Sequence, residues 1–64
     1  MDRERELKRI AILSLEELEE WKAHVLRCKA FFVKQRNTFE IEECDFLLEH
    51  IERRIRELKD GKGS

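Results

Sequence analysis

Several residue types that shape folds are scarce in this sequence. Proline is absent, and both glycines lie within the last four of the 64 residues. This excludes collagen, proline-rich linkers and sheets built on tight glycine turns. Two cysteines are too few for a disulfide scaffold, and no four-ligand zinc spacing accompanies them. No apolar run approaches the roughly 18 residues of a membrane-spanning helix. The remaining fold class is all-α.

Charged side chains are abundant and nearly balanced. Fourteen basic and fifteen acidic residues leave a formal net charge of -1, so no bulk field favours nucleic acid or an anionic membrane. Twelve Glu accompany three Asp, one Asn and one Gln, a bias typical of thermophilic proteins. The first residues, MDRERELKR, mix both charge signs and are unlike a secretory signal. We expect a cytoplasmic protein with reduced thiols.

Capping and turn residues divide the chain. Ser14 and Glu17 have the spacing of a capping box, which predicts a helix over 15–36. Asn37 and Thr38 favour a turn, and a second helix is predicted over 39–59. Residues 60–64 are predicted to form a flexible tail, with Gly61 in the left-handed position that ends a helix. Together with an N-terminal helical segment over 1–13, these parts form a single helical domain.

Both long helices carry an apolar stripe with alternating spacings of three and four residues. A two-residue link between helices of nearly equal length, about 33 and 31 Å, predicts an antiparallel hairpin. In that register Lys22 lies beside Glu52 and Lys29 beside Asp45, which predicts two ion pairs between the helices. The stripes consist of Leu18, Trp21, Val25, Cys28 and Phe32 in the first helix, and Ile41, Cys44, Leu48, Ile51, Ile55 and Leu58 in the second.

Residues 1–13 allow two arrangements. Leu7 and Ala11 continue the stripe of the following helix, so one helix of about 34 residues is possible. Alternatively, Leu7, Ile10 and Leu13 form the apolar stripe of a separate short helix that folds back on the hairpin. We favour the break, because the capping box at Ser14 marks a helix start.

Sites for chemistry are scarce. Cys28 and Cys44 occupy stripe positions and are interpreted as core thiols, because free cysteine behaves as a small hydrophobe. His24 and His50 lie at one level of the hairpin, and with Glu20 and Cys28 they suggest a metal site. Cys28 points into the core, however, so we expect no metal and no cofactor. The hydroxyls are assigned to caps, turn and tail, and no phosphate-binding glycine loop exists, so we expect no enzyme activity.

Two surfaces suggest binding. A basic strip without any acid runs from Lys22 to Arg36, but two of its lysines are assigned to acids of the other helix. Apolar residues outside the stripes are the stronger indication of binding, because a monomeric protein rarely exposes so many apolar side chains in one region, here near the loop. Either another chain or residues 7–13 must cover them. The basic strip comprises Lys22, Arg27, Lys29, Lys34 and Arg36; the apolar contacts predicted are Leu26, Phe31, Val33, Phe39 and Phe46.

A lone hairpin has a small core, so self-association is expected, with a four-helix bundle dimer as the first choice and a trimer or ring as the alternative. This layout resembles the Rop family of plasmid copy-number regulators, which bind paired RNA loops. The resemblance covers architecture and no motif. It implies RNA or DNA binding through the basic strip as an alternative to the function we favour, a small protein-interaction, regulatory or assembly module with a protein partner of unknown identity.

Overall fold

The fold is that of a computed structural model, which describes residues 2–60. Over these residues the chain forms three helices and no strand: α1 (Arg3–Ile12), α2 (Leu15–Lys34) and α3 (Thr38–Lys59). The all-α fold class is therefore confirmed. No helix among residues 2–60 is long and apolar enough to cross a membrane.

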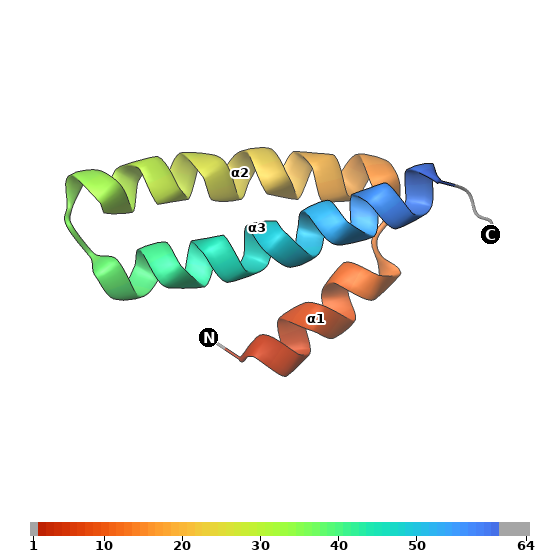
Figure 1. Ribbon diagram of the computed structural model, residues 1–64, viewed down its shortest axis with the longest axis horizontal. Helices are drawn as coiled ribbons and strands as arrows, with labels where there is room; N and C mark the ends of the chain where they lie inside the picture. Colours follow the sequence, from red (N-terminus) through yellow and green to blue (C-terminus); the bar gives the residue numbers. More distant parts are fainter. Residues whose placement is uncertain (1, 61–64) are drawn as a thin grey trace.

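Helices α2 and α3 run antiparallel, side by side along the molecule, and a short loop joins them at one end (Figure 1). The predicted capping box is present: the Ser14 hydroxyl accepts from the Glu17 amide at 3.1 Å, and the Glu17 carboxylate accepts from the Ser14 amide at 2.9 Å. At the loop, the Asn37 side chain accepts from the Glu40 amide at 3.2 Å. Asn37 is thus the N-cap of α3.

The loop is longer than the sequence indicates. We predicted that the first long helix continues to Arg36 and that the second begins at Phe39, but α2 ends at Lys34 and α3 begins at Thr38. Arg36 adopts φ 56°, in the left-handed region, where the α-helix cannot continue. Of the predicted tail 60–64, Asp60 is the C-cap residue of α3, and residues 61–64, including Gly61, lie outside the described part.

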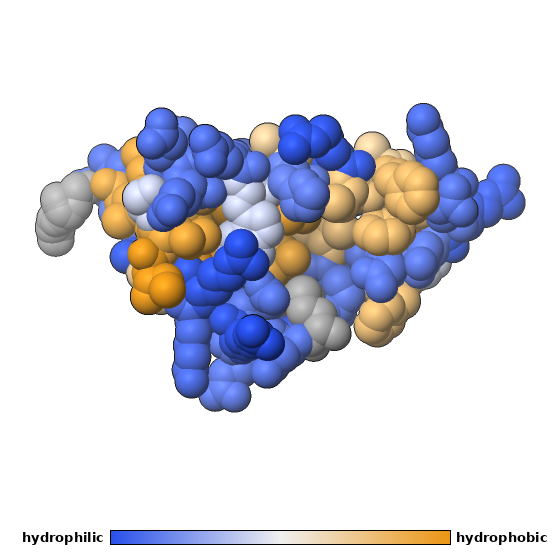
Figure 2. All heavy atoms as spheres, turned by 180° about the vertical axis from the view of Figure 1, so that it is seen from behind, coloured by the Kyte–Doolittle hydropathy of each residue, from blue (hydrophilic) through white to orange (hydrophobic). Residues whose placement is uncertain are grey.

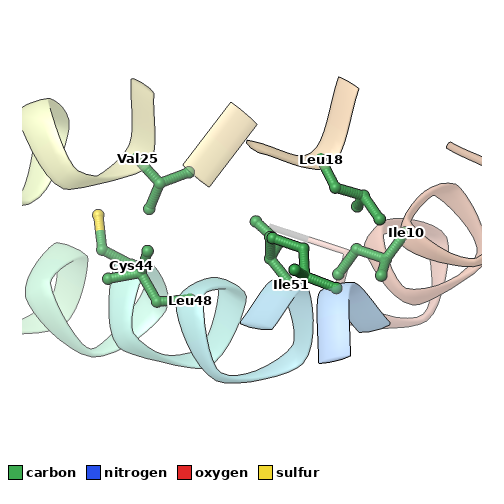
Figure 3. Close-up of a cluster of buried hydrophobic side chains, with 7 residues drawn as sticks. Ile10, Leu18, Val25, Cys44, Leu48 and Ile51 are labelled. Atoms are coloured by element: carbon green, nitrogen blue, oxygen red, sulfur yellow. The ribbon is translucent and has the colours of Figure 1, made fainter. Parts of the chain in front are cut away.

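The core runs along the interface between α2 and α3. Leu18 and Ile51 are fully buried, and Val25 faces Cys44 and Leu48 across the two helices (Figure 3). Trp21, Cys28, Phe32 and Leu58 pack around this cluster while remaining partly exposed. Both predicted ion pairs between the helices are present, Lys22–Glu52 at 3.3 Å and Lys29–Asp45 at 2.6 Å. The structure adds a third at the open end, Lys59–Glu19 at 3.4 Å.

Residues 3–12 form a separate helix, as favoured above. The chain turns at Leu13, whose ψ of 150° is extended, and α1 then lies beside α3 (Figure 1). Ile10 is the member of the predicted stripe that enters the core, at 4% exposure (Figure 3). Leu13 is half-buried and Leu7 is exposed at 38%. Of the predicted stripe, it is therefore mainly the Ile10 side chain that packs α1 against the core.

Polar contacts complete the attachment of α1. The Arg3 guanidinium lies 2.9 Å from the carboxylate of Glu43, a residue that is itself buried. The same guanidinium stacks over the ring of Phe46 at 4.2 Å. Near the other end of α1, Arg54 donates to the Ala11 carbonyl at 3.4 Å, which satisfies one of the carbonyls left free at a helix end.

Candidate protein-interaction surface

Four large apolar side chains surround the loop end of the molecule without being covered by the rest of the chain. They belong to the second half of α2 and the first turn of α3, and we call them the loop-end apolar surface: Leu26 (47% exposed), Phe31 (57%), Val33 (52%) and Phe39 (61%). In Figure 2 hydrophobic atoms gather at this end, on the right of the view. α1 contacts α3 from Glu43 and Phe46 to Arg54 and leaves these four residues exposed (Figure 1).

Phe46, the fifth apolar contact predicted from the sequence, has a different environment. It is half-buried, with the Arg3 guanidinium over its ring and the His50 ring 4.6 Å away. Arg3 of α1 therefore covers part of this ring, whereas the alternative predicted from the sequence assigned the cover to residues 7–13. The sequence could not show this, because Arg3 and Phe46 are far apart along the chain.

The five residues of the basic strip are divided by the structure into two groups. Lys22 and Lys29 form the ion pairs with α3 and face its acidic side. Arg27, Lys34 and Arg36 are exposed, and no ion pair between residues 2 and 60 includes them. The strip is therefore partly neutralised within the chain, and its unpaired charges lie in the second half of α2 and in the loop.

The two cysteines are free thiols, Cys44 buried and Cys28 half-buried. Burial raises the pKa of the Cys44 thiol above its ordinary value, and the neighbouring Cys28 acts in the same direction. His24 approaches Cys28, with 3.5 Å between Nε2 and Sγ, whereas His50 packs against Phe46. No group of three potential metal ligands comes together within residues 2–60. The paired histidines of the sequence hypothesis thus contact different neighbours.

A second apolar area lies at the opposite end of the molecule, and sequence reasoning missed it. Ile12 is 81% exposed at the corner between α1 and α2, beside the half-buried Leu13 and Leu15. The strongly hydrophobic atoms on the left of Figure 2 lie at this end. The available signal was the position of Ile12, which falls outside the stripe of Leu7, Ile10 and Leu13.

The surface between α1 and α3 holds a shallow open groove of about 180 Å³. Its lining includes the apolar Leu7 and Ile10 and the polar His50, Arg53 and Arg54. Both arginines of the lining already have partners, since Arg53 pairs with Glu49 at 3.5 Å and Arg54 with Glu57 at 3.3 Å. The groove thus offers no set of converging groups for catalysis.

Comparison of the chain with protein-family models, with curated proteins and with solved structures found no match in any of the three. Arguments about function therefore depend on the surface itself.

Proposed function

We propose that this chain is a small, self-associating helical module that acts by binding proteins and has no catalytic activity of its own. The observation that carries the proposal is the loop-end apolar surface. Two phenylalanines, Phe31 and Phe39, are more than half exposed within a few residues of each other along the chain. Exposed aromatic side chains of this kind are the residues that most often anchor protein interfaces.

Burial of these side chains has a substantial effect on a chain of this size. A phenylalanine that is about half exposed still offers on the order of 100 Å² to a partner, which corresponds to about 2–3 kcal/mol when buried. A single hydrophobic core in a domain this small contributes roughly 3–5 kcal/mol to the free energy of unfolding. Association through Phe31 and Phe39 therefore stabilises the fold by an amount similar to that of the core itself.

The smallest assembly we propose is a homodimer in which α2 and α3 of two copies form a four-helix bundle. Each copy contributes an elongated pair of helices, and a flat side of such a pair can pack against another. A trimer or ring is the alternative. Both cysteines are free thiols, the state expected of a protein in the cytoplasm.

Nucleic-acid binding is the second candidate. The exposed Arg27, Lys34 and Arg36 favour it, since they have no acidic partner within residues 2–60. The first candidate is preferred because Lys22 and Lys29 are already paired, and a binder of phosphates needs a continuous basic face.

Sedimentation equilibrium at micromolar concentrations tests self-association. We expect a dimer that dissociates on dilution, and a monomer for Phe31→Ser combined with Phe39→Ser. The matched control is Ile12→Ser, which removes an even more exposed apolar residue at the other end and should leave the dimer intact. A parent chain that stays monomeric, with a melting temperature independent of concentration, contradicts the proposal.

Titration of labelled RNA and duplex DNA at low and at physiological salt tests the second candidate. Micromolar binding that weakens steeply with salt and is lost when Arg27 and Lys34 are changed to Glu would favour nucleic acid instead. No binding at either salt leaves the interaction module as the function.

A further inference from the structure

Two thiols meet at the interface between α2 and α3. Cys44 is buried, at 6% exposure, and its Sγ points from α3 toward α2 (Figure 3). Cys28 packs against the same core cluster from α2 while remaining half-buried. The two thiols are close enough that Cys28 contributes to the raised pKa of Cys44. They are therefore neighbours in space although fifteen residues lie between them in the sequence.

An ion pair beside the two cysteines shows how they are aligned along the helices. Lys29 pairs with Asp45 at 2.6 Å, and each of these residues directly follows one of the cysteines. Because α2 and α3 are antiparallel, Cys28 and Cys44 are displaced by two residues, about 3 Å along the helix axes. Helices packed about 8–10 Å apart bring facing Cα atoms to within about 3.5–5.5 Å across the interface. Both distances together stay within the Cα separation of about 4.4–6.8 Å that a disulfide spans.

Cys28 also has the surroundings of a reactive thiol. Its Sγ lies 3.5 Å from Nε2 of His24, which is exposed one turn earlier on α2. The imidazole nitrogen can accept the thiol proton, and the thiolate that results is the nucleophile in thiol–disulfide exchange. Cys44 is buried, and burial disfavours its thiolate by raising its pKa. A reagent that arrives from solvent therefore reacts with Cys28 first.

We infer that Cys28 and Cys44 form a reversible disulfide by exchange with a low-molecular-weight disulfide such as oxidised glutathione. In the first step, the Cys28 thiolate attacks one glutathione sulfur, and the other leaves as a thiolate that takes the proton from His24. In the second step, Cys44 attacks the Cys28 sulfur, and its proton goes to the departing second glutathione. The protein thiols lose two electrons in total, which reduce the external disulfide to two thiols. An excess of reduced glutathione reverses both steps.

The bond links α2 covalently to α3 across the core. The fifteen residues between the cysteines, which include the loop, then form a closed ring that restricts the unfolded chain. For a ring of this size we expect the oxidised chain to melt about 10 °C or more above the reduced chain. Oxidation thus locks the two long helices together. This inference goes beyond the proposed function and does not require self-association.

Mass spectrometry of the full chain in glutathione redox buffers gives a direct test. As the share of oxidised glutathione rises, we expect a transient adduct with one glutathione, followed by a single chain that has lost two hydrogen atoms and no longer reacts with iodoacetamide. Non-reducing electrophoresis verifies that the bond lies within one chain. Circular dichroism of the oxidised and the reduced forms then measures the shift in melting temperature.

Single substitutions separate the two steps. Cys44→Ser should stop at the glutathione adduct, and Cys28→Ser should react about tenfold more slowly or not at all. His24→Asn should slow formation of the adduct about tenfold or more, without changing the melting temperature of the reduced chain. The matched control is His50→Asn, because the His50 ring packs against Phe46 and should not affect the rate.

The contrary outcomes are equally distinct. A parent chain that stops at the glutathione adduct, or that forms disulfides only between chains, refutes the bond between Cys28 and Cys44. An oxidised chain that melts like the reduced one refutes the locking of the two helices. If His24→Asn reacts as fast as His50→Asn, His24 does not activate the thiol. Because each readout follows a bond within one chain, a failure of the proposed self-association leaves this test unaffected.

Discussion

The contact between Arg3 and Glu43 allows a quantitative prediction about the attachment of α1. The Glu43 side chain is only 12% exposed, while that of Arg3 is 52% exposed, and their charged groups lie 2.9 Å apart. Changing Arg3 to alanine leaves a largely buried carboxylate without its partner. The loss of a hydrogen bond between charged groups lowers the free energy of unfolding by about 1.5–3 kcal/mol. Because solvent screens the half-exposed Arg3, we expect a loss near the lower limit of this range. Loss of the stacking on Phe46 adds about 0.5 kcal/mol.

We therefore expect Arg3→Ala to lower the free energy of unfolding by about 2 kcal/mol. When Glu43→Gln is already present, no charge remains to be stranded, and the same change should cost about 1 kcal/mol less. Urea denaturation of the four chains measures this coupling. Fluorescence of Trp21 reports directly on α1, because the Arg9 guanidinium lies over the indole ring at 4.4 Å.

Arg5→Ala is the matched control, since Arg5 lies on the same helix and its side chain has no ion pair among residues 2–60. Its effect should stay within about 0.5 kcal/mol. If Arg3→Ala has the same effect with and without Glu43, or if Arg5→Ala is equally destabilising, the ion pair does not hold α1 in place and the reasoning is refuted.

Three further predictions concern the hairpin. Ile51 is fully buried, so Ile51→Ala should cost about 2–5 kcal/mol and leave the chain largely unfolded by circular dichroism; a melting curve like that of the parent would contradict the assigned core. Arg36 adopts φ 56°, so Arg36→Gly should raise the melting temperature by a few degrees, about 0.5–1 kcal/mol, and a lower melting temperature would argue against the left-handed loop. Burial raises the pKa of the Cys44 thiol from its ordinary value of 9.0. The stability contributed by the neutral thiol is therefore fully present below pH 9 and is lost as the pH rises through the higher pKa of the folded state. Thermal melts from pH 7 to 10.5 should show this loss in the parent chain and not in Cys44→Val.

Features that depend on neighbouring residues or on a regular repeat could be predicted from the sequence. The capping box needs only Ser14 and Glu17, and its two hydrogen bonds are present. The pairs Lys22–Glu52 and Lys29–Asp45 follow from a constant register, because residues at equal distances from the loop lie opposite each other. The capping box could be predicted from neighbouring residues alone, and the two ion pairs from the regular repeat alone.

Features that depend on the path of the chain in space could not be predicted. The left-handed Arg36 shortens α2 by two residues, and its side chain has no property that marks this conformation. The partnership of Arg3 with Glu43 depends on the angle at which α1 leaves Leu13, which no repeat specifies. For the same reason, the sequence indicated the surplus of apolar residues near the loop but not that Phe46 is partly covered.

The position of α1 also constrains any assembly of this chain. α1 lies against the side of α3 that presents Glu43 and Phe46, so this side is already occupied within the chain. Leu26 and Val33 on α2 remain exposed. If α1 were instead released, it would expose the buried Ile10 and leave Glu43 without its ion partner, both of which are unfavourable. The short helix thus stabilises the pair formed by α2 and α3 and, in the proposed dimer, leaves the surface near the loop for association.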